Sequence, residues 1–272
     1  MKIYLAQINT FVGDIKRNTQ KVLDSIDTAR RAGADLVVFP ELTLLGYPPR
    51  DLLLHGDIIE ANLQALDSVR RASTGIGVIV GYVERNAESR GKGFFNAAAL
   101  CDDGRLISRH YKTLLPSYDI FDEGHYFDAS PCVQTTIFRG RVLAITICED
   151  MWNCNPFGDD RPRLYQVDPV EVLAAGEPDL HINISASPFS LGKRPLREGV
   201  LKDAVRRMRC PVIHVNLVGG NDSIIFDGWS AAYNRDGILA AQTSDFREDA
   251  VLLDADAMAG PLHPATTMGM PR

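Results

Sequence analysis

Three ionisable side chains follow directly after segments that have the pattern of β-strands. Glu41 follows LVVFP, Lys112 follows LISRHY, and Cys148 follows LAITI. Open α/β sheets place their chemistry at the carboxyl ends of such strands. A cysteine thiolate can attack an acyl carbon, a carboxylate in an apolar site can carry the proton, and a lysine ammonium can stabilise the oxyanion. The three residue types together therefore predict acyl transfer.

Each of the three residues also has a simpler interpretation when it is taken alone. A cysteine at the end of an apolar strand is commonly a small core residue, because free cysteine is among the most buried residue types. Lys112 could be a solvated strand end, and Glu41 an ordinary surface acid. Their joint placement after three strands favours the catalytic interpretation.

The segments that must position these residues alternate between strand and helix patterns. The spacing of apolar residues predicts helices at 17–32, 57–72, 169–176 and 194–208. Single strands are predicted at 2–8, 35–39, 76–83, 179–187, 211–220 and 250–254. Turn residues between apolar runs predict hairpins at 94–112, 133–148 and 224–242.

Hairpins that alternate with strand–helix–strand units imply mixed sheets with helices on their outer faces. Two such sheets packed face to face would bury all of these short apolar strands. We therefore predict an α/β fold, a four-layer α-β-β-α sandwich of two mixed β-sheets, over residues 1–255. Residues 256–272 contain Gly, Pro and Thr without periodicity, and they are predicted to be a linker-like tail.

The composition argues against several classes of protein. The 272 residues have a net charge of −6 and no basic run, so neither nucleic acid nor an anionic membrane is an expected partner. The chain has no signal-peptide pattern, and no apolar stretch approaches the ~20 residues of a membrane span. The five cysteines and six histidines lack the spacing of a disulfide framework or a metal site. We expect a cytoplasmic protein without bound metal.

Three longer motifs around these residues resemble the signatures of the nitrilase, or carbon–nitrogen hydrolase, superfamily. They are FPELTLLGYPPRDLLL, YKTLLPSYDIFDEGHYF and ICEDMW. The resemblance covers nearly the whole chain, from residue 1 to about residue 254. It implies the nitrilase-like sandwich and places the family's Glu-Lys-Cys triad on Glu41, Lys112 and Cys148.

A finer resemblance is to the glutaminase domains of glutamine-dependent NAD synthetases, through GYPPRDLLL, SYDIFDEGHYF, NISASPFSLGK and VGGNDSIIFDG. It implies hydrolysis of L-glutamine through a cysteine thioester, with the ammonia used for ATP-dependent amidation of deamido-NAD. Glu123 and Ser187 would accept from the α-ammonium, Lys193 would bind the α-carboxylate, and Glu149 would hydrogen-bond the substrate amide. The implied glutamine pocket comprises Tyr47, Tyr118, Phe121, Glu123, Glu149, Ser187 and Lys193.

The same resemblance implies partners and cofactors. The expected partner is a synthetase (ATP-pyrophosphatase) domain, and a homo-oligomer is also expected. The glutaminase reaction itself would need no cofactor, and ATP and Mg would belong to the synthetase domain. No SGG-type phosphate loop occurs in this sequence, so the chain is either a part of a longer protein or a separate glutaminase subunit.

Two further expectations concern surface segments. The segment NCNPFGDDRPRLYQVDP, at 153–169, is longer than the usual family connection and could form a lid, an interface loop or a channel element. The helix at 194–208 is expected to present Arg197, Lys202, Arg206 and Arg207 to solvent or to another subunit. Two other functions remain open, namely an amidase or carbamoylase for another small amide, and a catalytically idle scaffold.

Overall fold

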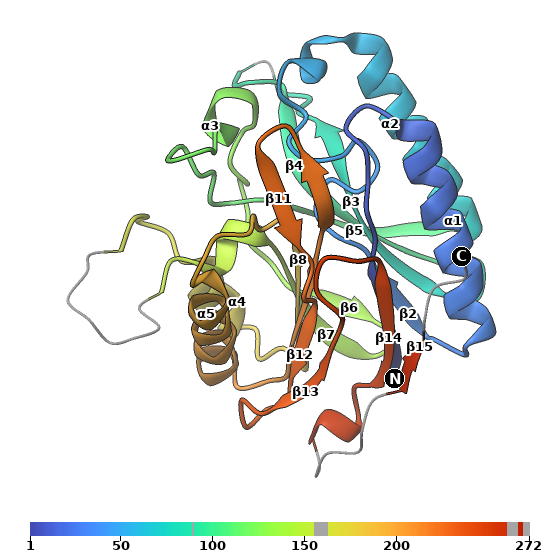
Figure 1. The fold of residues 1–272 in the computed structure, drawn as a ribbon, viewed down its shortest axis with the longest axis vertical. Coiled ribbons are helices and arrows are strands. Elements are labelled where there is room, and N and C mark those ends of the chain that lie inside the picture. Colours follow the sequence, from blue (N-terminus) through green and yellow to red (C-terminus); the bar gives the residue numbers. More distant parts are fainter. Residues whose placement is uncertain (89, 155–162, 260–265, 269–272) are drawn as a thin grey trace.

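Two large mixed β-sheets pack face to face, and helices cover the outer face of each sheet (Figure 1). The structure is a computed structural model that describes residues 1–88, 90–154, 163–259 and 266–268. The four layers are α1 and α2, the seven-stranded sheet, the six-stranded sheet, and α4 with α5. The predicted α-β-β-α sandwich is confirmed.

The seven-stranded sheet has a parallel centre with antiparallel strands on both sides. Strands β1, β2 and β3 are parallel, because helical crossovers connect them, whereas β4, β5, β14 and β15 pair antiparallel. The order across the sheet is β15 (Thr266–Met268), β14 (Asp249–Asp254), β1 (Lys2–Gln7), β2 (Leu36–Val38), β3 (Gly77–Arg85), β4 (Phe94–Asp102) and β5 (Arg105–Tyr111).

The six-stranded sheet has the same plan, with β7, β8 and β9 parallel at its centre. Its order is β13 (Leu239–Gln242), β12 (Ala231–Tyr233), β9 (Val212–Asn216), β8 (Leu180–Ser185), β7 (Arg141–Ile147) and β6 (Thr136–Phe138). The hairpins predicted at 94–112 and 133–148 are confirmed. The one predicted at 224–242 is only partly correct, because β11 (Ile224–Asp227) pairs with β10 (Val218–Asn221) in a separate two-stranded ribbon.

Four longer helices cover the sheets. Helices α1 (Ile15–Arg31) and α2 (Gly56–Ala72) lie on the seven-stranded sheet, and α4 (Pro169–Ala174) and α5 (Lys193–Met208) lie on the six-stranded sheet (Figure 1). Two of these helices begin with a side-chain cap: Asp14 accepts from the Arg17 N–H before α1, and Asp168 accepts from the Val170 and Glu171 N–H groups before α4. The short elements are η1 (Arg50–Leu54), α3 (Glu123–Tyr126), η2 (Cys148–Met151) and η3 (Ala257–Ala259).

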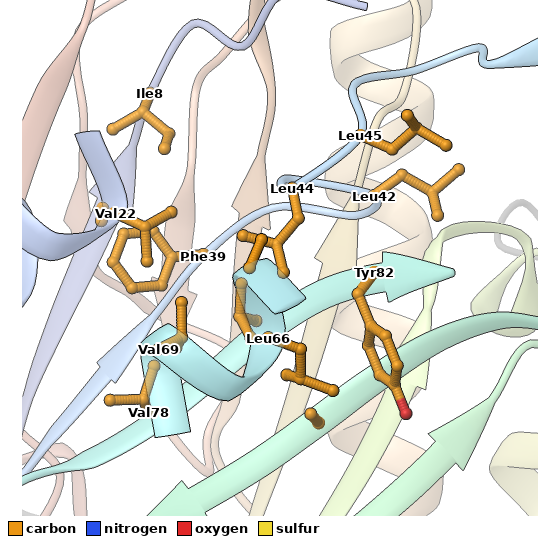
Figure 2. Close-up of a cluster of buried hydrophobic side chains, with 14 of the residues drawn as sticks. Ile8, Val22, Phe39, Leu42, Leu44, Leu45, Leu66, Val69, Val78 and Tyr82 are labelled. Carbon is orange, nitrogen blue, oxygen red and sulfur yellow. The ribbon is translucent and has the colours of Figure 1, made fainter. Parts of the chain in front are cut away.

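Alternation along the strands divides the core into separate layers. In β1, Ile3 and Leu5 point between the two sheets, whereas Tyr4 and Ala6 point toward α1 and α2. Figure 2 shows part of the outer layer, in which helix and strand side chains interdigitate. The labelled residues are Ile8, Val22, Phe39, Leu42, Leu44, Leu45, Leu66, Val69, Val78 and Tyr82. Because both faces of the central strands are buried, these strands read as nearly continuous apolar runs.

One surface expectation is only partly correct: Lys202 and Arg206 of α5 are exposed, whereas Arg197 and Arg207 are not. Arg197 of α5 is 1% exposed and forms a bidentate ion pair with Asp227 of β11, with nitrogen–oxygen distances of 3.1 and 3.0 Å. The Arg207 side chain is also mostly buried, and it pairs with Asp168 at 2.5 Å. Ion pairs to Asp227 and Asp168 therefore bind one side of α5 to neighbouring segments. The charged residues in the helix sequence do not show which of them form such pairs. No helix within the described residues is both long and apolar enough to span a membrane.

Candidate active site

Cys148 lies at the carboxyl end of β7, at the start of η2, and it is 5% exposed. Its backbone has a φ of +45°, a left-handed conformation that non-glycine residues rarely adopt. Strained backbone of this kind persists only where the surrounding structure holds it, and it is concentrated at functional sites. The conformation turns the chain sharply after the strand and separates Cys148 from an ordinary core residue.

Glu41 lies in the turn after β2 and is fully buried. Gly81 of β3 makes room for this turn, because a Cβ at Gly81 would lie 2.3 Å from the Leu42 nitrogen. The backbone of the turn is fixed on the same strand, since the Leu44 N–H donates to the Gly81 carbonyl at 3.1 Å. Glu41 Oε2 accepts the Ala186 N–H at 2.8 Å, which ties the carboxylate to the segment that follows β8.

Lys112 follows β5 and is also fully buried. Its Nζ donates to Glu41 Oε1 at 2.8 Å and to Glu123 Oε1 at 2.6 Å. Burial alone would lower the pKa of Lys112, but the negative charges of Glu123 and Glu41 outweigh burial and raise it well above its ordinary value. Lys112 is therefore a fixed cation at the site.

Glu123 is placed differently from the sequence expectation. Its Oε1 accepts from Lys112 and, at 2.8 Å, from the Tyr47 hydroxyl, while its Oε2 accepts from Asn96 Nδ2 at 3.3 Å. Burial raises its pKa, and the Lys112 charge opposes that rise. Because its oxygens are engaged inside the cluster, the geometry favours a second carboxylate that holds Lys112 over an acceptor for a substrate ammonium. Tyr47 therefore has two features at this site: an aromatic ring, and a buried hydroxyl that donates to Glu123.

The electrostatics around Cys148 determine its protonation in the resting protein. Burial raises the pKa of the Cys148 thiol, and the Glu41 charge raises it further, while the Lys112 charge acts in the opposite direction. The thiol therefore rests protonated at neutral pH. A base must remove its proton during attack, and the buried carboxylate of Glu41 can perform this transfer.

Two tyrosines converge on the carboxylate of Glu149, which directly follows Cys148. Tyr118 and Tyr165 donate their hydroxyls to Glu149 Oε1 at 2.8 and 3.0 Å. Burial raises the pKa of Glu149, and both hydroxyls oppose that rise. Phe121 packs edge-on against Tyr118, with ring centroids 5.5 Å apart. These side chains form one polar and aromatic wall beside the thiol.

Ser187 lies directly after β8, and Lys193 begins α5, which follows in the chain. Lys193 is the first residue of the helix, and its Nζ lies 5.4 Å from the centre of the Trp152 ring. Burial lowers the pKa of Lys193, and the negative charges of Glu149 and Asp227 act against this. Ser187 is 2% exposed, and its Oγ accepts weakly from Arg197 at 3.4 Å. The structure therefore gathers Lys193, Glu149 and the thiol into one electrostatic neighbourhood.

The sequence prediction missed several residues that shape this site. Asn96 donates to Glu41 at 2.6 Å, Tyr165 reaches Glu149 from the long segment after Trp152, and Gly81 admits the Glu41 turn. The signal for Asn96 was present, because a polar residue interrupts the apolar run of FFNAAAL. Within the long segment, residues 155–162 lie outside the described part of the chain, so its proposed role as a lid, interface or channel stays a prediction.

Metal-ligating side chains are not grouped in the described part of the chain: no cluster of three or more His, Cys, Asp or Glu there could hold a metal ion. His181 lies buried in β8, and burial lowers its pKa to about 3. The Nε2 atom of His181 shares a hydrogen bond with the Thr146 hydroxyl at 2.7 Å.

The four-layer sandwich, with a buried thiol, ammonium and carboxylate gathered beyond the ends of its strands, defines a class of hydrolase that acts on carbon–nitrogen bonds. The chain belongs to the carbon-nitrogen hydrolase family, which matches residues 2–262. The superfamily named from the three sequence motifs is confirmed.

Several proteins similar to this chain are glutamine-dependent NAD(+) synthetases. Over 264 residues the chain is 39% identical to a glutamine-dependent NAD(+) synthetase of Synechocystis sp., a match that covers 96% of this chain and 47% of that protein. The corresponding enzyme of Thermotoga maritima is 32% identical, with 94% of this chain and 42% of that protein covered. The chain thus spans slightly less than half the length of these relatives.

Solved structures agree with this assignment. The glutamine-dependent NAD+ synthetase of Acinetobacter baumannii superposes with a TM-score of 0.82 at 30% identity, covering 96% of this chain and 48% of that one. A mutant of the Nesterenkonia AN1 amidase, from the nitrilase superfamily, superposes with a TM-score of 0.78 at 20% identity, covering 95% of this chain and 92% of that one. The second likeness bears on the fold alone.

Proposed function

We propose that this chain is a glutamine amidohydrolase, which releases ammonia from L-glutamine for the ATP-dependent amidation of deamido-NAD to NAD. The observation that supports the proposal most strongly is the buried Glu41–Lys112 pair beside Cys148, with the Lys193 ammonium nearby, in a chain that matches glutamine-dependent NAD(+) synthetases over most of its length. The pair supplies the chemistry, and Lys193 supplies a charge that an amino-acid substrate needs.

Acylation would use the cluster as follows. Glu41 removes the thiol proton as Cys148 Sγ attacks the side-chain amide carbon of glutamine. The negative charge that develops on the amide oxygen is stabilised by Lys112 Nζ and by the backbone N–H of Glu149. Collapse of the tetrahedral intermediate breaks the carbon–nitrogen bond, Glu41 returns the proton to the leaving nitrogen, and ammonia departs from a γ-glutamyl thioester.

Deacylation would repeat these steps with water as the nucleophile. Glu41 removes a proton from the water, the oxyanion forms again beside Lys112, and the thiolate of Cys148 leaves and recovers the proton. The products are L-glutamate and the free enzyme. No step draws on a metal or an organic cofactor, and ATP and Mg belong to the proposed synthetase domain.

Recognition of glutamine would rest on charges at both sides of the pocket. Lys193, the first residue of α5, would bind the α-carboxylate, and the hydroxyl of Ser187, which follows β8, would accept from the α-ammonium. Glu149 is better placed than Glu123 to accept from the amino group or the amide of glutamine, since two tyrosines hold it at the pocket wall. Tyr118 and Phe121 would pack on the methylene groups of the substrate.

The proposal includes a partner and a location. Ammonia released here would pass to a synthetase domain, and the function is placed in the cytoplasm, where cysteines stay reduced. Free hydrolysis would waste glutamine, so we expect the chain to be slow alone and faster when the synthetase domain and its ligands are supplied. Homo-oligomer formation remains a prediction.

A substrate panel tests the proposal. Purified chain is incubated with L-glutamine, L-asparagine and simple amides without a carboxylate, and ammonia and the acid product are measured, with Cys148→Ala as the matched inactive variant. The proposal expects glutamine to be the best substrate, and it expects no turnover in Cys148→Ala. Preference for a simple amide or a carbamoyl compound would instead support an amidase or carbamoylase, and no turnover of any amide would support a scaffold.

A further inference from the structure

Asp150 is a buried acid whose side chain binds backbone and has no role in the chemistry described above. It lies in η2, two residues after Cys148, and is 2% exposed. Its Oδ1 accepts the N–H groups of Thr113 and Leu114, both at 2.9 Å. Its Oδ2 accepts the N–H of Ile147 at 3.0 Å. One carboxyl group thus receives three backbone hydrogen bonds.

These hydrogen bonds join two segments that carry catalytic groups. Thr113 directly follows Lys112 at the end of β5, and Ile147 directly precedes Cys148 at the end of β7. The two strands belong to different sheets, which pack through apolar side chains. Apolar packing is not directional, whereas hydrogen bonds to the oxygens of a carboxyl group depend on distance and angle. The Asp150 carboxylate therefore sets the geometry between the two strand ends.

The backbone at Cys148 gives a second reason for such a restraint. The residue has a φ of +45°, and the N–H that enters the turn, that of Ile147, is the one that Asp150 Oδ2 accepts. Without this acceptor the turn could relax toward an ordinary conformation and withdraw the thiol from its place beside Glu41 and Lys112. Because its oxygens are directed at backbone N–H groups, Asp150 acts through other residues.

We propose that Asp150 is a positioning residue, which holds Lys112 and the Cys148 thiol in register across the two sheets. This inference rests on the proposed thiol-dependent hydrolysis of glutamine. It implies that a defect at Asp150 lowers the rate of the chemical step and leaves substrate binding by Lys193 and Glu149 intact.

The test compares Asp150→Asn with Asp168→Asn. Asp168 is a stringent control, because it is also buried and accepts two backbone N–H groups, of Val170 and Glu171, at the start of α4, and it pairs with Arg207 in addition. An amide at position 150 keeps its shape but turns an N–H₂ group toward at least one backbone donor. We expect kcat for glutamine to fall about 100-fold with KM within a factor of about three, as small misplacements of catalytic groups do. Asp168→Asn should retain kcat.

The outcomes separate this inference from the proposed function. Inactive wild-type protein would overturn the function itself, whereas active wild type with unchanged kcat in folded Asp150→Asn would overturn only the role of Asp150. Equal losses of kcat in both variants would mark a general loss of structure and would also overturn it. If Asp150→Asn does not fold, Asp150→Glu keeps the charge but moves it by one methylene, and the same kcat loss with retained KM is expected.

Discussion

The strained turn at Cys148 predicts an unusual response to glycine. A non-glycine residue in the left-handed region costs about 1–2 kcal/mol, and glycine removes that cost. Replacing a buried alanine by glycine elsewhere removes a methyl group and loosens the unfolded chain, at a cost of about 1–2 kcal/mol in total. At position 148, where φ is +45°, the two effects oppose each other. Cys148→Gly should therefore be nearly as stable as Cys148→Ala.

The matched control is Ala144→Gly, in the same strand and fully buried, where the backbone is extended and no strain can be released. The free energy of unfolding is measured by urea titration with linear extrapolation. We expect the alanine-to-glycine change to cost about 1–2 kcal/mol less at 148 than at 144, or about 2–8 °C in melting temperature for a chain of this size. Equal costs at the two positions would refute the argument that strain is stored at Cys148.

Three other predictions concern neighbouring features. Gly81→Ala should lower kcat about 100-fold, because the added Cβ displaces the turn after β2. Gly56→Ala, whose Cβ would meet open space, should leave kcat unchanged. Equal kcat in the two variants would contradict the close approach of this turn to Gly81. Lys193→Ala should raise KM for glutamine far more than KM for a simple amide. Because burial lowers the pKa of Lys193, its ammonium loses its proton at a lower pH than an ordinary lysine does. KM for glutamine should therefore rise at alkaline pH, and it should rise less in Lys193→Arg. Arg197→Met should lower the free energy of unfolding by about 3–5 kcal/mol, because it leaves Asp227 unpaired. Adding Asp227→Leu should restore most of that stability. If stability is not restored, the loss does not come from the unpaired charge.

The arrangement of the catalytic groups was predictable because its signals are local. Apolar runs of strand length end directly before Glu41 and Cys148, and α/β folds place their chemistry at the carboxyl ends of strands. The turns between hairpin strands are also encoded in two or three residues, as at Asp103 and Gly104, both of which have positive φ. The fold class and the grouping of Glu41, Lys112 and Cys148 therefore followed from the sequence.

The partners of single side chains were not predictable, because they depend on contacts between distant segments. Arg197 lies in a helix rich in charged residues, and its partner Asp227 is on a ribbon 30 residues away. Glu123 matched a substrate-binding position by motif, yet its oxygens are taken by Lys112, Tyr47 and Asn96 in the folded chain. A one-dimensional pattern shows that a residue is polar, but it does not show which buried group satisfies it.

The proposed hydrolysis requires that Cys148 form a thioester with the side chain of glutamine. The most direct measurement is mass spectrometry of the chain after rapid acid quenching with L-glutamine, followed by mapping of the modified peptide. We expect an adduct on Cys148 with the mass of glutamine minus ammonia, formed by wild type and absent from Cys148→Ala. Steady production of glutamate by Cys148→Ala, or an adduct on another residue, would contradict it.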